Sequence, residues 1–136
     1  MLGCIYSQKK KVGINLCHLG DILHKDELIQ LHQLLIYVRK KLNNLYGTEI
    51  DKYFEEYDSL KIFPHHIHRT KAEHTYAIFL LSSAIAKIYS EYGNMPRSVS
   101  SRLKNTGDKI GKEILRKKRF TSDTGNTTNN KRGNNN

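Results

Sequence analysis

The chain has 136 residues, of which 23 are Lys or Arg and 13 are Asp or Glu, so its formal net charge is +10. This length allows one domain of ordinary size with tails and excludes two substantial domains. A charge of this sign favours polyanions as electrostatic partners. The longest nearly apolar stretch, residues 77–86, is about half of the roughly 20 residues that a membrane-spanning helix needs, so we expect no transmembrane segment.

The first 22 residues are expected to form an irregular leader. Lys9, Lys10 and Lys11 are not followed by the apolar block that a secretory signal requires, so we expect a cytoplasmic protein. Cys4 and Cys17 lack the close spacing of thiolate metal sites, and we expect two reduced thiols there.

The first clear helix is predicted over residues 25–45, because its apolar residues recur at steps of three and four and therefore share one face. His24 continues this stripe at its N-terminal end, and Asn43, Asn44 and Gly47 supply stop signals. The stripe consists of Leu28, Leu31, Leu35, Val38, Leu42 and Leu45.

Two further helices are predicted before residue 93. A short one is expected over residues 49–57, with Thr48 as its N-cap, followed by a loop over residues 58–68. A long one is expected to open at Thr70, because Thr70 and Glu73 fit the capping-box pattern, and to end near Tyr92 before Gly93. The stripe of the long helix is Ile78, Leu81, Ile85, Ile88 and Tyr92, with His74 at its N-terminal end.

A fourth helix is predicted over residues 98–116, with a thin apolar face interrupted by Gly107 and Gly111. Residues 120–136 are rich in Asn, Thr and Gly, and we expect a disordered C-terminal tail there. The sequence therefore predicts an all-α fold, a small bundle of about four helices over residues 23–119. Its two strong stripes look like the matched faces of a bundle, and we expect a homo-oligomer, with a dimer as the simplest case.

Five of the seven histidines lie at predicted helix starts or in the loop before one, which is the main chemical signal. Neutral imidazole is the commonest protein ligand for zinc, and a tetrahedral site needs about four donors. His66, His68 and His74 give three donors within nine residues, and His24 is the preferred fourth. The sequence thus predicts a site for Zn²⁺ or another divalent transition metal.

Plainer interpretations stand beside this one. His66 and His68 would then be exposed loop residues, and His74 a hydrogen-bonded residue at the edge of the core. His32 is the alternative fourth ligand, although its place beside the first stripe favours a core histidine. No HExxH motif or placed general base accompanies the cluster, so we predict no catalytic residues and a structural rather than a catalytic site.

Two segments resemble uncharacterised protein family 0058, a small archaeal family, some of whose members are labelled metal-binding. They are LHKDELIQLHQLL (residues 23–35) and FPHHIHRTKAEHTYAIFLLSSAIA (residues 63–86). The resemblance covers roughly residues 23–117 and implies a helical fold and a metal site, but no reaction. Similar proteins start where Leu23 stands, so we hypothesise an over-extended gene start, which native peptides from upstream of Leu23 would refute.

Nucleic-acid binding is the alternative function, and a helical interaction subunit is a third. Residues 97–136 hold eleven basic and three acidic residues, a net charge of +8, so most of the positive charge is C-terminal. These side chains could track phosphates nonspecifically, although no recognition motif accompanies them. The candidate residues are Arg102, Lys104, Lys109, Lys112, Arg116, Lys117, Lys118 and Arg119.

Overall fold

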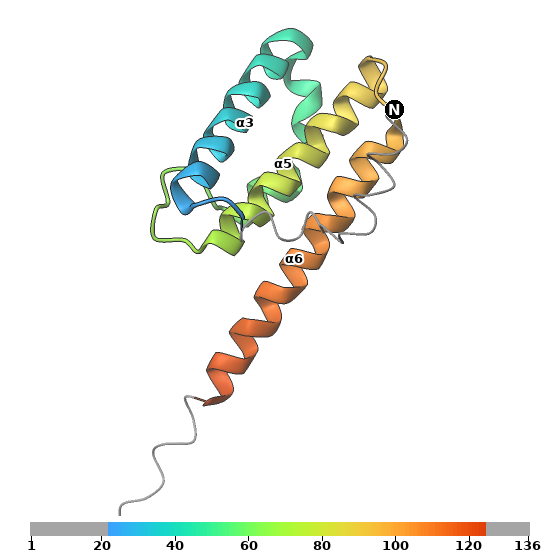
Figure 1. The fold of residues 1–136 in the computed structure, drawn as a ribbon. Coiled ribbons are helices and arrows are strands. Elements are labelled where there is room, and N and C mark those ends of the chain that lie inside the picture. Colours follow the sequence, from blue (N-terminus) through green and yellow to red (C-terminus); the bar gives the residue numbers. More distant parts are fainter. Residues whose placement is uncertain (1–21, 125–136) are drawn as a thin grey trace, which may run out of the picture.

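The computed structural model describes residues 22–124, and that part of the chain contains helices and no strand, which confirms the all-α prediction (Figure 1). The elements are α3 (Lys25–Tyr46), the 3₁₀-helix η2 (Gly47–Tyr53), α4 (Glu55–Leu60), α5 (Lys71–Tyr92) and α6 (Arg97–Thr124). The predicted leader up to residue 21, and the predicted tail from residue 125 onward, lie outside the described residues.

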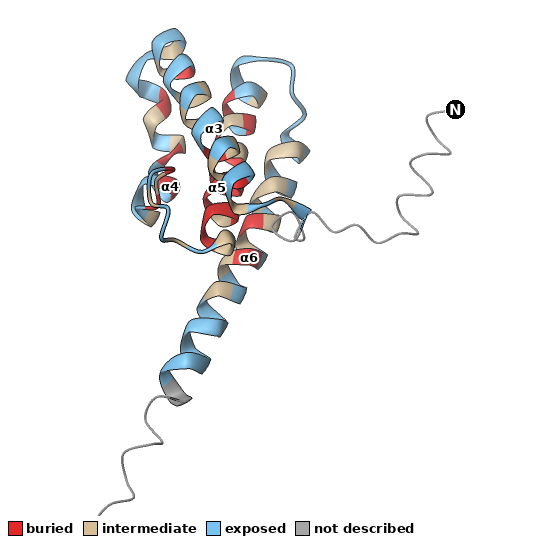
Figure 2. Ribbon diagram, turned by 60° about the vertical axis from the view of Figure 1, so that its left-hand side comes forward, coloured by how far each residue is buried: buried red, intermediate tan, exposed pale blue. Residues whose placement is uncertain are grey.

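α5 is the central helix, and most of its residues are buried (Figure 2). It begins as predicted, because the Thr70 hydroxyl accepts the Glu73 N–H at 3.2 Å while Glu73 Oε2 accepts the Thr70 N–H at 3.0 Å. These two bonds satisfy backbone donors that an α-helix leaves unpaired at its start. The cap therefore fixes where His74, the fourth residue of α5, enters the core.

α3 packs on one side of α5, and the two helices begin at the same end of the bundle (Figure 1). Leu28 and Leu42 of the α3 stripe are almost completely buried, as are Leu81 and Ile88 of the α5 stripe. The last residue of each stripe is not buried, because the bundle ends there. Leu45 is 74% exposed, and Tyr92 is 45% exposed and stacks on Tyr46 at 4.8 Å between ring centroids.

The single helix predicted over residues 49–57 was wrong. The chain forms η2 and then α4, with a break at Phe54, whose backbone angles (φ −100°, ψ 0°) lie outside the α-helical range. The break turns Ile50, Phe54 and Tyr57 into the core together. Arg39 holds it from outside, because its guanidinium lies 4.4 Å from the Phe54 ring centroid and binds both carboxylate oxygens of Asp58.

α6 packs on the other side of α5 and projects beyond the bundle at its C-terminal end (Figures 1 and 2). Its two glycines are contact points: a Cβ at Gly107 would lie 3.2 Å from the Phe79 Cβ, and one at Gly111 would lie 3.0 Å from the Tyr76 Cζ. The predicted end at residue 116 was wrong, and residues 120–124, predicted as tail, are helical. No glycine or proline lies between Gly111 and Gly125, so a local stop signal is absent near residue 116.

Of the helices in the described part of the chain, none combines the length and the apolar character that crossing a membrane requires.

Candidate functional site

The core contains a buried histidine network, formed by His32, His74, Tyr57 and the carbonyls of Ile62 and His66. His32 of α3 and His74 of α5 are both 0% exposed, and their Nδ1 atoms lie 3.2 Å apart. The other ring nitrogen of His32 lies 2.8 Å from the Tyr57 hydroxyl of α4. The network thus joins three helices through polar contacts inside an apolar core.

Both ends of this network are main-chain carbonyls of the segment before α5. The Tyr57 hydroxyl lies 3.1 Å from the Ile62 carbonyl, and His74 Nε2 lies 3.0 Å from the His66 carbonyl. When both histidine rings are neutral, the network has three polar hydrogens, one on each ring and one on the Tyr57 hydroxyl, for its four contacts. A carbonyl can only accept, so His74 Nε2–H donates to His66 and the Tyr57 hydroxyl donates to Ile62. The tautomer in which His32 Nδ1–H donates to His74 pairs the two facing Nδ1 atoms. His32 Nε2 then accepts from the Tyr57 hydroxyl, which shares its one hydrogen between His32 and Ile62.

Burial keeps the network uncharged at neutral pH. Burial, reinforced by the neighbouring His74, lowers the pKa of His32 to about 4. Burial also lowers the pKa of His74, against the opposing effect of its hydrogen bond to His66, and raises the pKa of the Tyr57 phenol. Protonation of one histidine would supply the missing fourth hydrogen. Placing a charge in the closed core, however, costs more than the added hydrogen bond contributes. The network is therefore a structural connection between α3, α4, α5 and the segment before α5.

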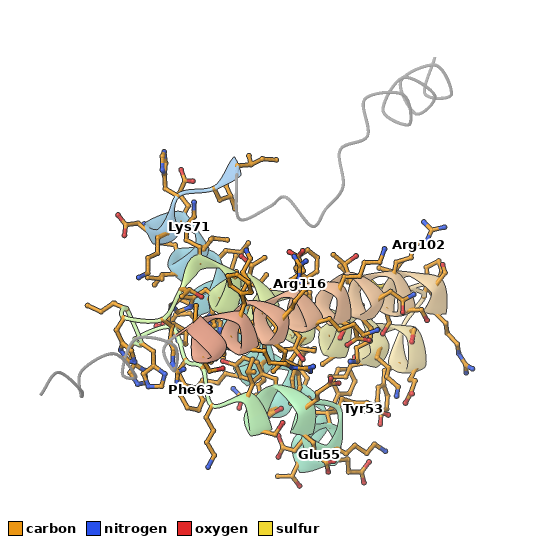
Figure 3. All side chains as sticks on the ribbon, turned by 90° about the horizontal axis from the view of Figure 1, so that it is seen from below. Tyr53, Glu55, Phe63, Lys71, Arg102 and Arg116 are labelled. Atoms are coloured by element: carbon orange, nitrogen blue, oxygen red, sulfur yellow. The ribbon has the colours of Figure 1, made fainter. Side chains whose placement is uncertain are left out.

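A second group of histidines lies on the loop between α4 and α5. The ring centroids of His65 and His66 are 4.3 Å apart, and those of His66 and His68 are 5.6 Å apart. His66 Nδ1 accepts the N–H of Phe63 (labelled in Figure 3) at 3.2 Å, so His66 Nε2 is the nitrogen available to a ligand. Partial burial, and then the neighbouring histidines and Arg69, lower the pKa of His66 and favour its neutral form.

The four predicted metal ligands do not share one point in the described structure. The His74 ring points into the core toward His32. His66 contacts the His74 ring through its main-chain carbonyl rather than through its own ring. His24 is the exposed N-cap of α3, where its N–H donates to Glu27 Oε2 at 2.8 Å. Among residues 22–124, no three His, Cys, Asp or Glu side chains are arranged to hold a metal ion. The core interpretation of His32 is confirmed, whereas metal binding stays a prediction.

The candidate cations of α6 divide into two sets. Lys104 binds Glu56 and Asp108 at 2.6 Å each, and Lys118 binds Glu73 of α5 at 3.1 Å. These two lysines are therefore used by the fold itself. Lys117 is exposed, but a helical turn of 100° per residue places it toward the apolar side of α6.

The remaining predicted cations form a basic stripe, spaced by seven, three, four and three residues and therefore on one face of α6. All five are exposed, and Figure 3 shows the side chain of Arg102 pointing away from the bundle. Arg116 has a 3.4 Å contact with Glu113, which is also exposed. The basic stripe consists of Arg102, Lys109, Lys112, Arg116 and Arg119.

Tyr57 is the network residue that the sequence did not reveal. Its spacing marks it as an apolar member of a short helix, and its ring is buried as that pattern suggests. Its hydroxyl, however, joins His32 to the main chain. The available signal is chemical: a buried tyrosine hydroxyl requires a partner, and a histidine beside the apolar stripe of another helix is a suitable one.

Comparisons with known proteins place the chain among archaeal relatives. The uncharacterised protein family UPF0058 matches residues 23–110. A UPF0058 protein of Methanocaldococcus jannaschii is 64% identical over 96 residues, which cover 71% of this chain and 92% of the relative. One from Methanothermobacter thermautotrophicus is 52% identical over 96 residues (69% and 92%), and one from Archaeoglobus fulgidus is 35% identical over 92 residues (68% and 97%). No solved structure matches the chain. The chain therefore belongs to the uncharacterised protein family UPF0058.

Proposed function

We propose that the protein binds nucleic acid without sequence specificity through the basic stripe of α6. The observation that carries this proposal is the concentration of five exposed cations on one face of a helix that projects from the bundle. From Arg102 to Arg119 the stripe extends about 26 Å at 1.5 Å per residue. Over that distance a duplex presents many phosphates, since it carries one charge per roughly 1.7 Å of its axis.

The surroundings of the stripe support a solvent-facing contact rather than an internal one. None of Arg102, Lys109 and Lys112 forms an ion pair with another described residue, whereas Lys104 and Lys118 do. Over its whole length α6 has nine basic and three acidic residues. Each phosphate that a Lys or Arg neutralises releases condensed counterions, and this release drives nonspecific binding.

Binding to a labelled DNA duplex and to RNA should therefore fall steeply with salt. If all five cations contact phosphates, the affinity is expected to drop by two to three orders of magnitude between 50 and 200 mM salt, from a slope of about −0.9 per phosphate. Replacing Lys109 and Lys112 by Glu should weaken binding at least tenfold and flatten that slope. Fluorescence anisotropy titrations measure both quantities.

A charge-matched variant separates the stripe from net charge. Lys40 and Lys41 are exposed on α3, and replacing both by Glu changes the net charge by the same amount. That variant should bind nearly as tightly as the unchanged protein. Equal losses for the two variants, or no binding at 50 mM salt, would contradict the proposal.

Binding of a divalent metal ion at the histidine loop is the second candidate function. It is supported by the 5.6 Å between the His66 and His68 rings, because two imidazoles on one Zn²⁺ have centroids roughly 5 Å apart when each Zn–N bond is about 2.0–2.1 Å. The lowered pKa of His66 acts in the same direction, since only the neutral ring ligates. Such a site would be structural, with His24 as a further donor after a movement of the chain.

Metal analysis of untagged protein tests this candidate. Near-stoichiometric zinc is expected, and a His66→Ala, His68→Ala double variant should lose it while remaining folded. A His74 variant is a poor probe, because the His74 ring is part of the core. A His32→Leu variant serves as the control and should retain its zinc. Untagged protein that holds no zinc after dialysis against a micromolar supply would refute the metal site.

A further inference from the structure

A cleft of about 320 Å³ lies between α6, the start of α5 and the segment that follows α4. One part of its lining is apolar and includes Ile62, Ile114 and Leu115. The other part is charged and consists of Arg69, Glu73 and Lys118. This combination of an apolar wall and a few converging polar groups is typical of small-molecule sites, and the volume is at the small end of their range of about 300–1,000 Å³.

Among the described residues that line this cleft, Glu73 supplies the only carboxylate, and that carboxylate is already saturated with donors. Its Oε2 accepts hydrogen bonds from the N–H and the hydroxyl of Thr70, and its Oε1 lies 3.1 Å from Lys118 Nζ and 3.4 Å from an Arg69 terminal nitrogen. Burial raises the pKa of Glu73, but these donors outweigh it, so the net direction is downward and the carboxylate stays ionised. The single negative charge of Glu73 therefore balances one of the two cations, Arg69 and Lys118, and leaves one positive charge uncompensated.

Arg69 and Lys118 bring two cations to the polar side of the cleft. Arg69 contacts Glu73 through one terminal nitrogen, at 3.4 Å, and 38% of its side chain is exposed. A guanidinium carries five N–H donors in a planar fork, so this one long contact leaves terminal N–H groups for a ligand. Lys118 has one N–H directed to Glu73 and two further N–H donors, and 63% of its side chain is exposed. Together the two cations offer more donors than the protein satisfies.

We propose that this cleft binds a small amphipathic monocarboxylate. Its carboxylate would accept from terminal N–H groups of Arg69 and from Lys118, and its alkyl or aryl body would pack against Ile62, Ile114 and Leu115. The charge argues for a monoanion, because Arg69, Lys118 and Glu73 sum to a single positive charge. A dianion such as phosphate would be repelled by Glu73, and a guanidinium matches the planar carboxylate in geometry.

Isothermal titration with octanoate tests the site, with two probes that separate its halves. Octanol has the chain without the charge, and acetate has the charge without the chain. Octanoate is expected to bind one per chain and to raise the melting temperature, while both other probes bind at least tenfold more weakly. If octanol binds as tightly as octanoate, the cleft does not recognise the carboxylate and the proposal is contradicted. The absence of octanoate binding at millimolar concentration would also overturn the proposal.

Matched substitutions locate the ligand. Lys118→Met removes the cleft cation but keeps the length of the side chain, and octanoate should then bind at least fivefold more weakly. Lys117→Met makes the same change beside it, at an exposed residue outside the cleft lining, and should leave the affinity unchanged. Leu115→Trp, at a residue 56% exposed, should fill the cleft and abolish binding without unfolding the protein. Equal effects of the two lysine variants would show diffuse attraction and contradict the site.

Discussion

A His32→Leu variant is expected to lose about 2–3 kcal/mol of unfolding free energy, because leucine fits the volume but removes both hydrogen bonds of the ring. The Tyr57 hydroxyl can still donate to the Ile62 carbonyl at 3.1 Å. The Nδ1 of His74 has no such alternative in a fully buried position, so its lone pair is left without a donor. Urea unfolding followed by circular dichroism measures the loss.

Two further variants show whether the loss comes from the hydrogen-bonded pair. His68→Leu makes the same change at an exposed histidine and should alter stability by less than about 0.5 kcal/mol. Adding His74→Leu to His32→Leu should cost almost nothing more. The second change removes the orphaned nitrogen, and the His66 carbonyl keeps its hydrogen bond from the Arg69 N–H at 3.0 Å. Strictly additive losses would show that the two rings contribute by packing alone.

Mild acid should destabilise the protein well above the pH at which its carboxylates titrate. His32 has a pKa of about 4 in the folded chain and an ordinary value of 6.5, so between these values the unfolded chain binds more protons. Stability is therefore complete above pH 6.5 and falls as the pH drops. At 1.36 kcal/mol per pKa unit, His32 accounts for about 2 kcal/mol lost by pH 5 and about 3 kcal/mol lost by pH 4.

Urea unfolding between pH 7.5 and 5 tests this dependence. The pKa of His74 is also lowered, so the stability that His74 contributes is likewise lost as the pH falls. The pKa of Glu73 is lowered from 4.5, so its contribution disappears only below this window. The His32→Leu variant should have a shallower pH dependence than the unchanged protein. A free energy of unfolding that stays constant from pH 7 to 5 would show that the network accepts a proton without cost.

The sequence by itself determined α3 and α5, because their signals are local. The α3 and α5 stripes repeat within one turn of the helix, and the Thr70–Glu73 cap lies within four residues. It also identified the cations of α6, though not which of them face solvent. The break at Phe54 was missed because it depends on the burial of Ile50, Phe54 and Tyr57 against other helices, and periodicity within one segment contains no information on that packing.

Only the tertiary structure decided which distant side chains meet. His32 and His74 are 42 residues apart and form a buried pair, while His66 and His74, eight residues apart, meet through a carbonyl rather than through their rings. In the same way, Lys118, one of the cations predicted to contact phosphates, pairs with Glu73, which lies 45 residues away in the sequence. A helical repeat fixes which face of a segment is apolar. It does not fix which helix covers that face, because the pairing depends on the summed packing of the whole chain.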